Sequence, residues 1–268
     1  MFGLFSGPSK YSRKYLLSYI QQDFIFMFIN TLLICIFFLI ILPLPNSASG
    51  ANPFRNAPIN LPEPMIFDLA LPLGSTRNDY EFNTLFQYDF EHDDVVMNPE
   101  FEYAFAHGYG IELELPMKNT AVEAYKLALQ GTFDFFHTEK FIHGWQWYGE
   151  YIKHTKEFEN NLFYVFGYEF NDKWSTLNMT GLRLTDMSAH GHTEKLINAN
   201  LFYTFTTNLI AGLEVNWDSR PNRPDTAIVM PQLHVKVTKY AKIQFGFGMK
   251  KMGDEYFPHA ASRLIYRH

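Results

Sequence analysis

The stretch Tyr80-Glu-Phe-Asn-Thr-Leu-Phe-Gln-Tyr-Asp-Phe90 determines the fold class. Aromatic residues and one threonine occupy every second position, and mainly polar residues stand between them. Because successive side chains of a β-strand point to opposite faces, this spacing predicts a strand with one apolar and one polar face. The same period of two recurs, among other places, at 162–170, 197–205, 209–217, 229–237 and 241–249.

The repetition predicts about twelve strands of roughly ten residues, the length with which a tilted strand crosses a membrane. We expect them near 80–90, 99–106, 109–116, 124–136, 140–153, 161–170, 173–184, 195–205, 208–217, 226–238, 241–250 and 258–267. Short turns alternate with longer loops between these ranges, and an even count places both termini on the short-turn, periplasmic side. In lipid no backbone polar group can stay unpaired, so such a sheet must close on itself. Residues 80–268 are therefore predicted to form an all-β, transmembrane, antiparallel up-and-down β-barrel in the outer membrane of a Gram-negative bacterium.

The composition excludes several other classes of protein. Aromatic residues make up 18% of the 268 residues and charged residues 19%, which argues against a disordered chain and against a coiled coil. Mean hydropathy is -0.16, too low for a bundle of transmembrane helices. The formal charge of -6 argues against nucleic acid as a partner, and a single cysteine, Cys35, excludes a disulfide framework and a cysteine-based metal site.

The N-terminus, residues 1–51, is predicted to be an export signal. Basic residues precede an apolar run at 24–44, and the run ends in prolines and small residues up to Ala51. An uncleaved membrane anchor is the alternative, since the run is long enough to span a bilayer. Residues 52–79 carry five prolines and are predicted to be an extended periplasmic lead-in. Within it, the apolar stretch Met65–Leu73 is expected to be either a short extra strand or a segment tucked into a cavity.

Two parts of the sequence carry resemblances to known proteins. The end of the chain, Arg263-Leu-Ile-Tyr-Arg-His268, resembles the C-terminal assembly signal of bacterial outer-membrane barrels, with His268 in place of the usual aromatic residue. The hairpin at 100–116, with 124–131 and 141–146, resembles the phenol-degradation meta-pathway "transporter" barrels. These resemblances imply recognition by the barrel assembly machinery and passage of small molecules, and they supply no catalytic residues.

Residues opposite in parity to the apolar face are predicted to line the lumen and to govern selectivity. Strands early in the chain contribute the acidic side chains Glu81, Glu100, Glu102, Glu112 and Glu114. Later strands and 124–136 contribute the basic or titratable side chains Lys126, His234, Lys236, Lys242 and Arg263. Opposed charged walls can select solutes in an open pore, or they can pair across the lumen and hold it closed.

The functional prediction is a channel or facilitator for passive diffusion of small solutes, which needs no cofactor. A closed barrel with a structural or surface-interaction role is the first alternative, and a lipid-active enzyme is the second. No His-x-Ser pair stands on a predicted strand, so no catalytic residue is proposed. His190 and His192 near Asp186 and Glu194 are interpreted as a solvated loop rather than a metal site.

The expected partners are outer-membrane lipid, lipopolysaccharide, the assembly machinery and a solute of unknown identity. Within 173–184, Leu177 and Met179 stand in the opposite phase to Leu182 and Leu184, which predicts a β-bulge near Gly181.

Overall fold

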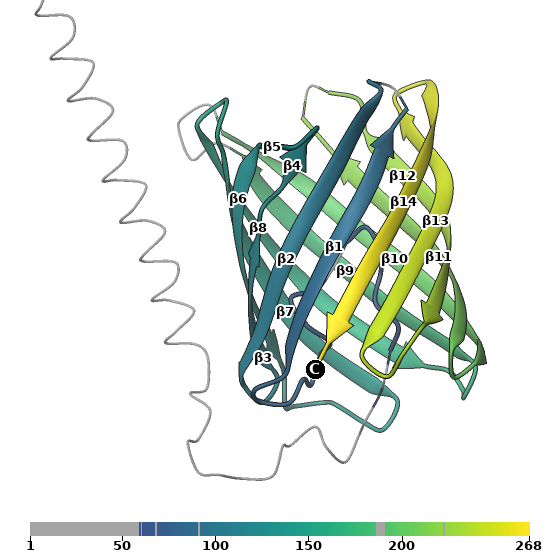
Figure 1. Ribbon diagram of the computed structural model, residues 1–268. Helices are drawn as coiled ribbons and strands as arrows, with labels where there is room; N and C mark the ends of the chain where they lie inside the picture. Colours follow the sequence, from purple (N-terminus) through teal and green to yellow (C-terminus); the bar gives the residue numbers. More distant parts are fainter. Residues whose placement is uncertain (1–58, 60, 68, 91, 186–190, 222) are drawn as a thin grey trace, which may run out of the picture. The chain divides into compact units, whose positions relative to one another are not determined.

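A closed antiparallel barrel accounts for most of the chain that the computed structural model describes, namely residues 59, 61–67, 69–90, 92–185, 191–221 and 223–268 (Figure 1). Within these residues the wall consists of twelve strands: β1 (Tyr80–Asp89), β2 (Asp94–Ala106), β3 (Tyr109–Glu114), β6 (Ala124–Thr132), β7 (Phe141–Ile152), β8 (Glu157–Glu169), β9 (Trp174–Thr185), β10 (His192–Thr206), β11 (Leu209–Ser219), β12 (Thr226–Lys236), β13 (Ala241–Met252) and β14 (Glu255–Arg267). The short strands β4 (Met117–Lys118) and β5 (Ala121–Val122) form a hairpin beside β2.

The first strand closes the sheet. β1 pairs with β2 on one side and with β14 on the other, so Glu81 stands opposite Glu102 and also opposite Arg267. No free edge is left in this ring of strands, which is what a sheet in lipid requires. The structure confirms the predicted all-β barrel. The predicted export segment 1–51 lies outside the described residues.

The two rims of the barrel differ less in loop length than the sequence pattern predicts. The near rim holds the start of β1, the end of β14 and the connections 107–108, 133–140, 170–173, 207–208 and 237–240. The far rim holds the connections 115–123, 153–156 and 253–254 and the described residues of three more, namely 90, 92–93, 191, 220–221 and 223–225. Strand pairing continues to Met252 opposite Glu255, so the loop expected at 251–257 is a tight turn. Backbone pairing extends beyond the apolar alternation there, because alternation reports only the part of a strand that faces lipid.

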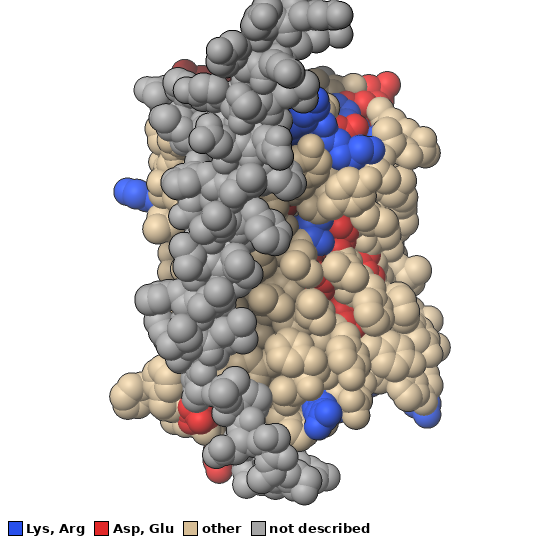
Figure 2. All heavy atoms as spheres, turned by 90° about the vertical axis from the view of Figure 1, so that its left-hand side faces the viewer, with Lys and Arg blue, Asp and Glu red and all other residues tan. Residues whose placement is uncertain are grey.

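The outer surface of the barrel is apolar. Side chains such as Leu213, Val229 and Phe247 point outward and are 42%, 44% and 63% exposed. Figure 2 shows one face that is mostly tan, with charged atoms mainly towards the ends and in a narrow central strip. Exposed aromatic side chains lie close to the rims, as amphipathic rings do at the headgroup level of a membrane; they include Phe90, Phe170, Trp174, Phe205 and Tyr266. Within the part of the chain that the structure describes, no helix is long and apolar enough to cross a bilayer.

The end of the chain takes part in the aromatic layer at the near rim. The ring of His268 stacks on Tyr80 at 5.3 Å and on Tyr240 at 5.4 Å between ring centroids. Its backbone amide donates a hydrogen bond of 3.0 Å to the carbonyl oxygen of Tyr80. A flat imidazole therefore stacks between two tyrosine rings at the position where the resemblance to the assembly signal leads us to expect an aromatic residue.

A segment of the expected lead-in lies inside the barrel, and we call residues 61–67 and 69–74 the plug. Met65, Leu69 and Leu71 of the plug are fully or almost fully buried. Met65 and Leu69 pack with inward-facing apolar side chains of the wall, which form two clusters that include Leu85, Ile142, Phe163, Val165, Leu177, Met179, Leu196, Phe202, Met230 and Ala261. Of the two arrangements expected for Met65–Leu73, the structure shows the segment tucked into a cavity. The preceding and following parts of 52–79 that the structure describes lead into and out of the plug.

Inward-facing glycines make room for the plug. A Cβ atom at Gly110 would come within 2.8 Å of the carbonyl oxygen of Ala70, and one at Gly167 within 2.0 Å of Leu61. A Cβ atom at Gly246 would come within 2.3 Å of Met65. The wall is thus shaped around this segment.

The predicted bulge near Gly181 is wrong. β9 pairs with β8 in an unbroken register from Ser175 to Leu184, and Leu182 and Leu184 point outward. Leu177 and Met179 point inward and are each 2% exposed, because they pack against the plug rather than against lipid. An apolar inner face, and not a change of phase, explains the pattern.

Candidate functional site: the barrel interior

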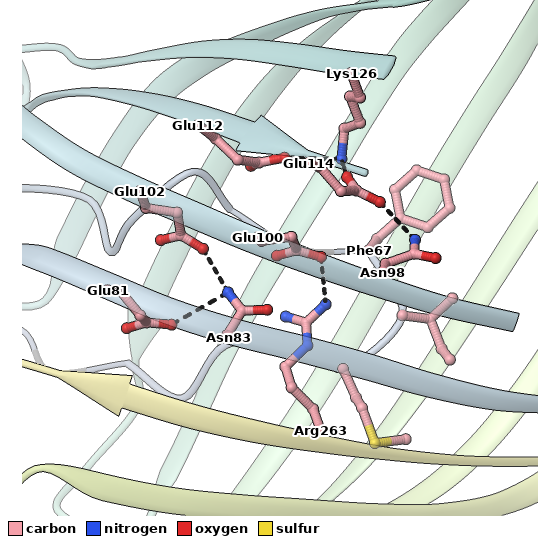
Figure 3. A network of polar contacts seen from close by, with 12 residues as sticks. Phe67, Glu81, Asn83, Asn98, Glu100, Glu102, Glu112, Glu114, Lys126 and Arg263 are labelled. Carbon is pink, nitrogen blue, oxygen red and sulfur yellow. Dashed lines mark hydrogen bonds and ion pairs between the residues drawn. The ribbon is translucent and has the colours of Figure 1, made fainter. Parts of the chain in front are cut away.

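An acidic arc lies on the inner face of β1, β2 and β3 (Figure 3). Its five carboxylates are all buried, and Cα register places several of them directly opposite one another: Glu81, Glu100, Glu102, Glu112 and Glu114. Asn83 lies between two of them and donates to Glu102 Oε1 at 2.5 Å and to Glu81 Oε1 at 3.4 Å. Facing carboxylates repel, so this arc requires nearby cations or donors.

Two cations from other strands meet the acidic arc. Lys126 Nζ lies 3.0 Å from Glu112 and also contacts Glu114. Lys126 stands directly opposite Glu114 where β6 pairs with β3. Arg263, which is 1% exposed, lies 4.0 Å from Glu100. These ion pairs run along the wall, since β6 is the neighbour of β3, and β14 is separated from β2 only by β1 (Figure 3). Pairing across the lumen, one of the two expected arrangements, stays a prediction.

The other predicted basic residues lie at the near rim. His234, Lys236 and Lys242 line a cavity of about 110 Å³ together with plug residues that include Glu63. The imidazole of His234 shares a 3.0 Å hydrogen bond with Gln232, and Lys236 stands opposite Lys242 in the register. Among the described residues, neither lysine forms an ion pair within 4 Å. This end of the interior therefore presents positive charge next to the plug.

A second charged network, near the far rim, was not predicted from the sequence. Arg183 donates to Asn161 at 2.9 Å and pairs with Glu194 at 3.0 Å and with Glu159 at 3.5 Å. Arg220 extends the network, since it lies 3.8 Å from Glu194 and 3.6 Å from the side chain of Asp218. Arg183 was not predicted to face the lumen, because a bulge was expected near Gly181. In the structure β9 is unbroken, and Arg183 points inward on the same face as Leu177 and Met179.

Glu214 on β11 binds residues 65–67, which we call the tip of the plug. Its carboxylate accepts hydrogen bonds from the backbone amides of Met65 at 2.8 Å, Ile66 at 3.1 Å and Phe67 at 3.1 Å. Side-chain amides of the wall complete its coordination, namely those of Asn198, Asn216 and Gln232. Among the described residues no lysine, arginine or histidine lies within ion-pair distance of this fully buried carboxylate. Its charge is balanced by N–H donors, half of which belong to the plug.

Further bonds fix the two limbs of the plug. Gln130 donates to the carbonyl oxygen of Leu71, and Gly74 donates its amide hydrogen to Thr132 Oγ1 at 2.8 Å. On the other limb, Gln244 donates to the carbonyl oxygen of Glu63 at 3.4 Å. Polar inner residues that would otherwise face water thus satisfy the irregular backbone of the plug.

A larger cavity lies between the tip of the plug and the far rim. Its volume is about 240 Å³, and both Ile66 and Phe67 of the plug border it. Wall residues from β2, β3, β6, β7, β8 and β9 form its other sides. The plug therefore separates this cavity from the near-rim cavity that Leu61 and Glu63 border.

The loop that carries the two histidines of the sequence prediction is described only in part. His192 lies 3.3 Å from Glu194, while His190 and Asp186 lie outside the described residues. Across the described ranges there is no group of three or more His, Cys, Asp and Glu residues that could hold a metal ion.

Comparisons with known proteins give likenesses of fold. No family model matches the chain, and no curated protein matches it. Among solved structures, a KdgM porin in complex with disordered oligogalacturonate is similar with a TM-score of 0.55 and 14% identity, over 70% of this chain and 98% of that chain. A NanC porin is similar with a TM-score of 0.56 and 7% identity, over 70% of this chain and 99% of that chain. The resemblance to the phenol-degradation "transporter" barrels is not confirmed. The comparisons show that this chain has the barrel fold of these outer-membrane porins.

Proposed function

We propose that the protein is an outer-membrane channel through which small solutes diffuse passively. The observation that carries this proposal is the pair of cavities, about 240 Å³ and about 110 Å³, that the plug borders on either side of a polar interior. An apolar outer wall and a charged inner wall are the combination expected of a barrel that offers a path through lipid. The porin fold of the similar structures supports the same function by analogy.

The plug makes this a gated channel rather than a constitutively open one. Its apolar side chains fill the middle of the interior, so conduction requires the plug to shift or leave. Hydrogen bonds, ion pairs and apolar contacts between the described residues hold it to the wall, with Glu214 as the central polar anchor. The carboxylates and lysines that we expect to influence selectivity once the plug shifts are Glu112 and Glu114 towards one side, and Lys236 and Lys242 at the near rim.

A closed structural barrel is the second candidate, and the buried plug and paired charges favour it. Under this alternative the interior polar groups would serve stability alone. No described feature favours the lipid-active enzyme. Under either candidate we expect outer-membrane lipid and lipopolysaccharide around the wall, and the assembly machinery as the partner that inserts it.

Planar-bilayer recording of the refolded full chain separates the two candidates. Discrete current steps would support the channel, and the reversal potential under a salt gradient would show which sign of ion it prefers. The folded state is verified by the shift in gel mobility between heated and unheated samples. A folded protein that never conducts, even when the plug anchor Glu214 is replaced by alanine, would favour the structural barrel.

A further inference from the structure

The far-rim cavity is built with one polar side and one apolar side. The apolar side includes Phe67 of the plug together with Phe163 and Met179 of the wall. The rings of Phe67 and Phe163 meet edge to face at 5.7 Å, which leaves a preorganised aromatic surface. On the polar side are side chains of β2, β3, β6, β7 and β9, of which Asn98, Glu114 and Lys126 appear together in Figure 3.

Several hydrogen-bond acceptors on the polar side are unfilled. Gln146 is 2% exposed and lines the cavity, and among the described residues its Oε1 has no hydrogen-bond partner. Asn98 also lines the cavity; its amide nitrogen donates to Glu114, while its Oδ1 has no partner in the described part of the chain. Glu150 lines the same wall and forms no hydrogen bond or ion pair within the described residues. A buried acceptor without a donor is costly, so this side of the cavity favours a guest that brings N–H or O–H groups.

Both cations that line the cavity already form ion pairs with carboxylates of the wall. Lys126 is shared between Glu112 and Glu114 and lies over the ring of Tyr148 at 4.7 Å. Arg183 is shared between two further carboxylates, those of Glu159 and Glu194. The lining itself holds two carboxylates, Glu114 and Glu150, and two cations, and both cations are also paired with carboxylates outside the lining. An anionic guest would therefore compete with carboxylates for these cations.

From this arrangement we propose that the far-rim cavity binds a small organic cation, a primary ammonium group carried on an apolar or aromatic skeleton. An ammonium group has three N–H donors and no acceptor, which suits the open oxygens of Gln146, Asn98 and Glu150. The skeleton would lie against Phe67 and Phe163. The volume of about 240 Å³ limits the guest to a molecule of a few to about a dozen heavy atoms. The inference rests on the proposed function in that it names the class of solute the channel would admit, but binding itself does not require transport.

Three probes with one skeleton test the proposal: 2-phenylethylamine, 2-phenylethanol and phenylacetate. Isothermal titration of the folded full chain in detergent, against a detergent-only blank, should give saturable binding of the amine about tenfold or more tighter than the alcohol. Phenylacetate should bind most weakly. Equal affinities for all three probes, tightest binding of phenylacetate, or no saturable amine binding would overturn the proposal.

Variants place the binding at this cavity. Glu150→Gln should weaken amine binding about tenfold, because it removes the open carboxylate and preserves the shape of the side chain. The matched control Glu255→Gln changes the same charge at an exposed position of the far rim and should leave the affinity unchanged. Unchanged affinity in a folded Glu150→Gln protein would contradict the assignment. Amine binding by a protein that does not conduct even as the Glu214→Ala variant would contradict the channel and leave this site in place, whereas conductance without amine binding would contradict the site alone.

Discussion

Replacing Glu214 by alanine should release the tip of the plug. The substitution removes three backbone hydrogen bonds, from Met65, Ile66 and Phe67, to one buried carboxylate. Hydrogen bonds to a charged group contribute about 1.5–3 kcal/mol each. We use the lower value, because water that enters behind a displaced plug replaces part of the lost hydrogen bonding. Three such bonds give about 4.5 kcal/mol, which raises the population of the displaced plug by roughly a thousandfold.

Hydrogen–deuterium exchange read by mass spectrometry measures this release directly. Protection of the amides at 65–67 against exchange should fall by a factor of about a hundred to a thousand. Protection of the amides in the wall strands should stay unchanged. Single-channel recording of the same protein should show a large rise in open probability. Glu159→Ala is the control, since it removes an inward carboxylate that pairs with Arg183 and that forms no hydrogen bond or ion pair with the described residues of the plug.

The reasoning would be refuted by a folded Glu214→Ala protein whose amides at 65–67 stay as protected as in the unmodified chain. Glu214→Gln is a second variant for the case in which Glu214→Ala fails to fold. It keeps the volume of the side chain and loses only part of its capacity to accept hydrogen bonds. It should give an intermediate loss of protection. Current without any loss of protection would mean that ions pass beside a seated plug.

Three further results are expected. Arg263→Met should lower the free energy of unfolding by about 3 kcal/mol, read from urea titration, because it removes a cation that is paired with the buried Glu100; an unchanged midpoint would contradict that pairing. Leu213→Arg places a charge on the lipid side of β11 and should cost about 2–4 kcal/mol, seen as a smaller folded fraction in vesicles, whereas Leu213→Met should be neutral. His268→Phe should assemble as well as the unmodified chain, because a ring remains between the two tyrosines that flank it; His268→Ala should assemble more slowly in a vesicle-insertion assay, and equal rates would remove the stacking argument.

The wall could be predicted from the sequence because each strand carries its own signal. Alternation at 80–90 and 140–153 anticipated β1 (Tyr80–Asp89) and β7 (Phe141–Ile152) to within a residue or two. Lipid imposes the same demand at every strand, an apolar outer face, and that demand is local in sequence. Neighbouring strands then pair in chain order, so the sequence places Glu114 and Lys126 on adjacent strands, and the structure adds the register in which they stand opposite each other.

The interior was harder to predict because its contacts are distant in sequence. The bond between Met65 and Glu214 spans 149 residues, and no local pattern announces it. The rule that inner residues are polar assumes a hydrated lumen, and it fails at Leu177 and Met179, which face the plug. Apolar residues at these two inward positions indicate an apolar segment inside the barrel, here the plug, rather than the bulge that the sequence pattern predicts.

The plug enters and leaves the barrel through one mouth. Leu61 and Glu63 border the near-rim cavity on one limb, and on the other Gly74 bonds to Thr132 while Ser75 accepts a 2.8 Å hydrogen bond from Gly108 in the near-rim turn. A loop with both limbs at the same opening is not threaded, so it can be withdrawn without passing a chain end through the ring or breaking a strand pair. The ring between β1 and β14 can therefore be completed before the plug is seated. Seating can then be undone and repeated for as long as the barrel stands.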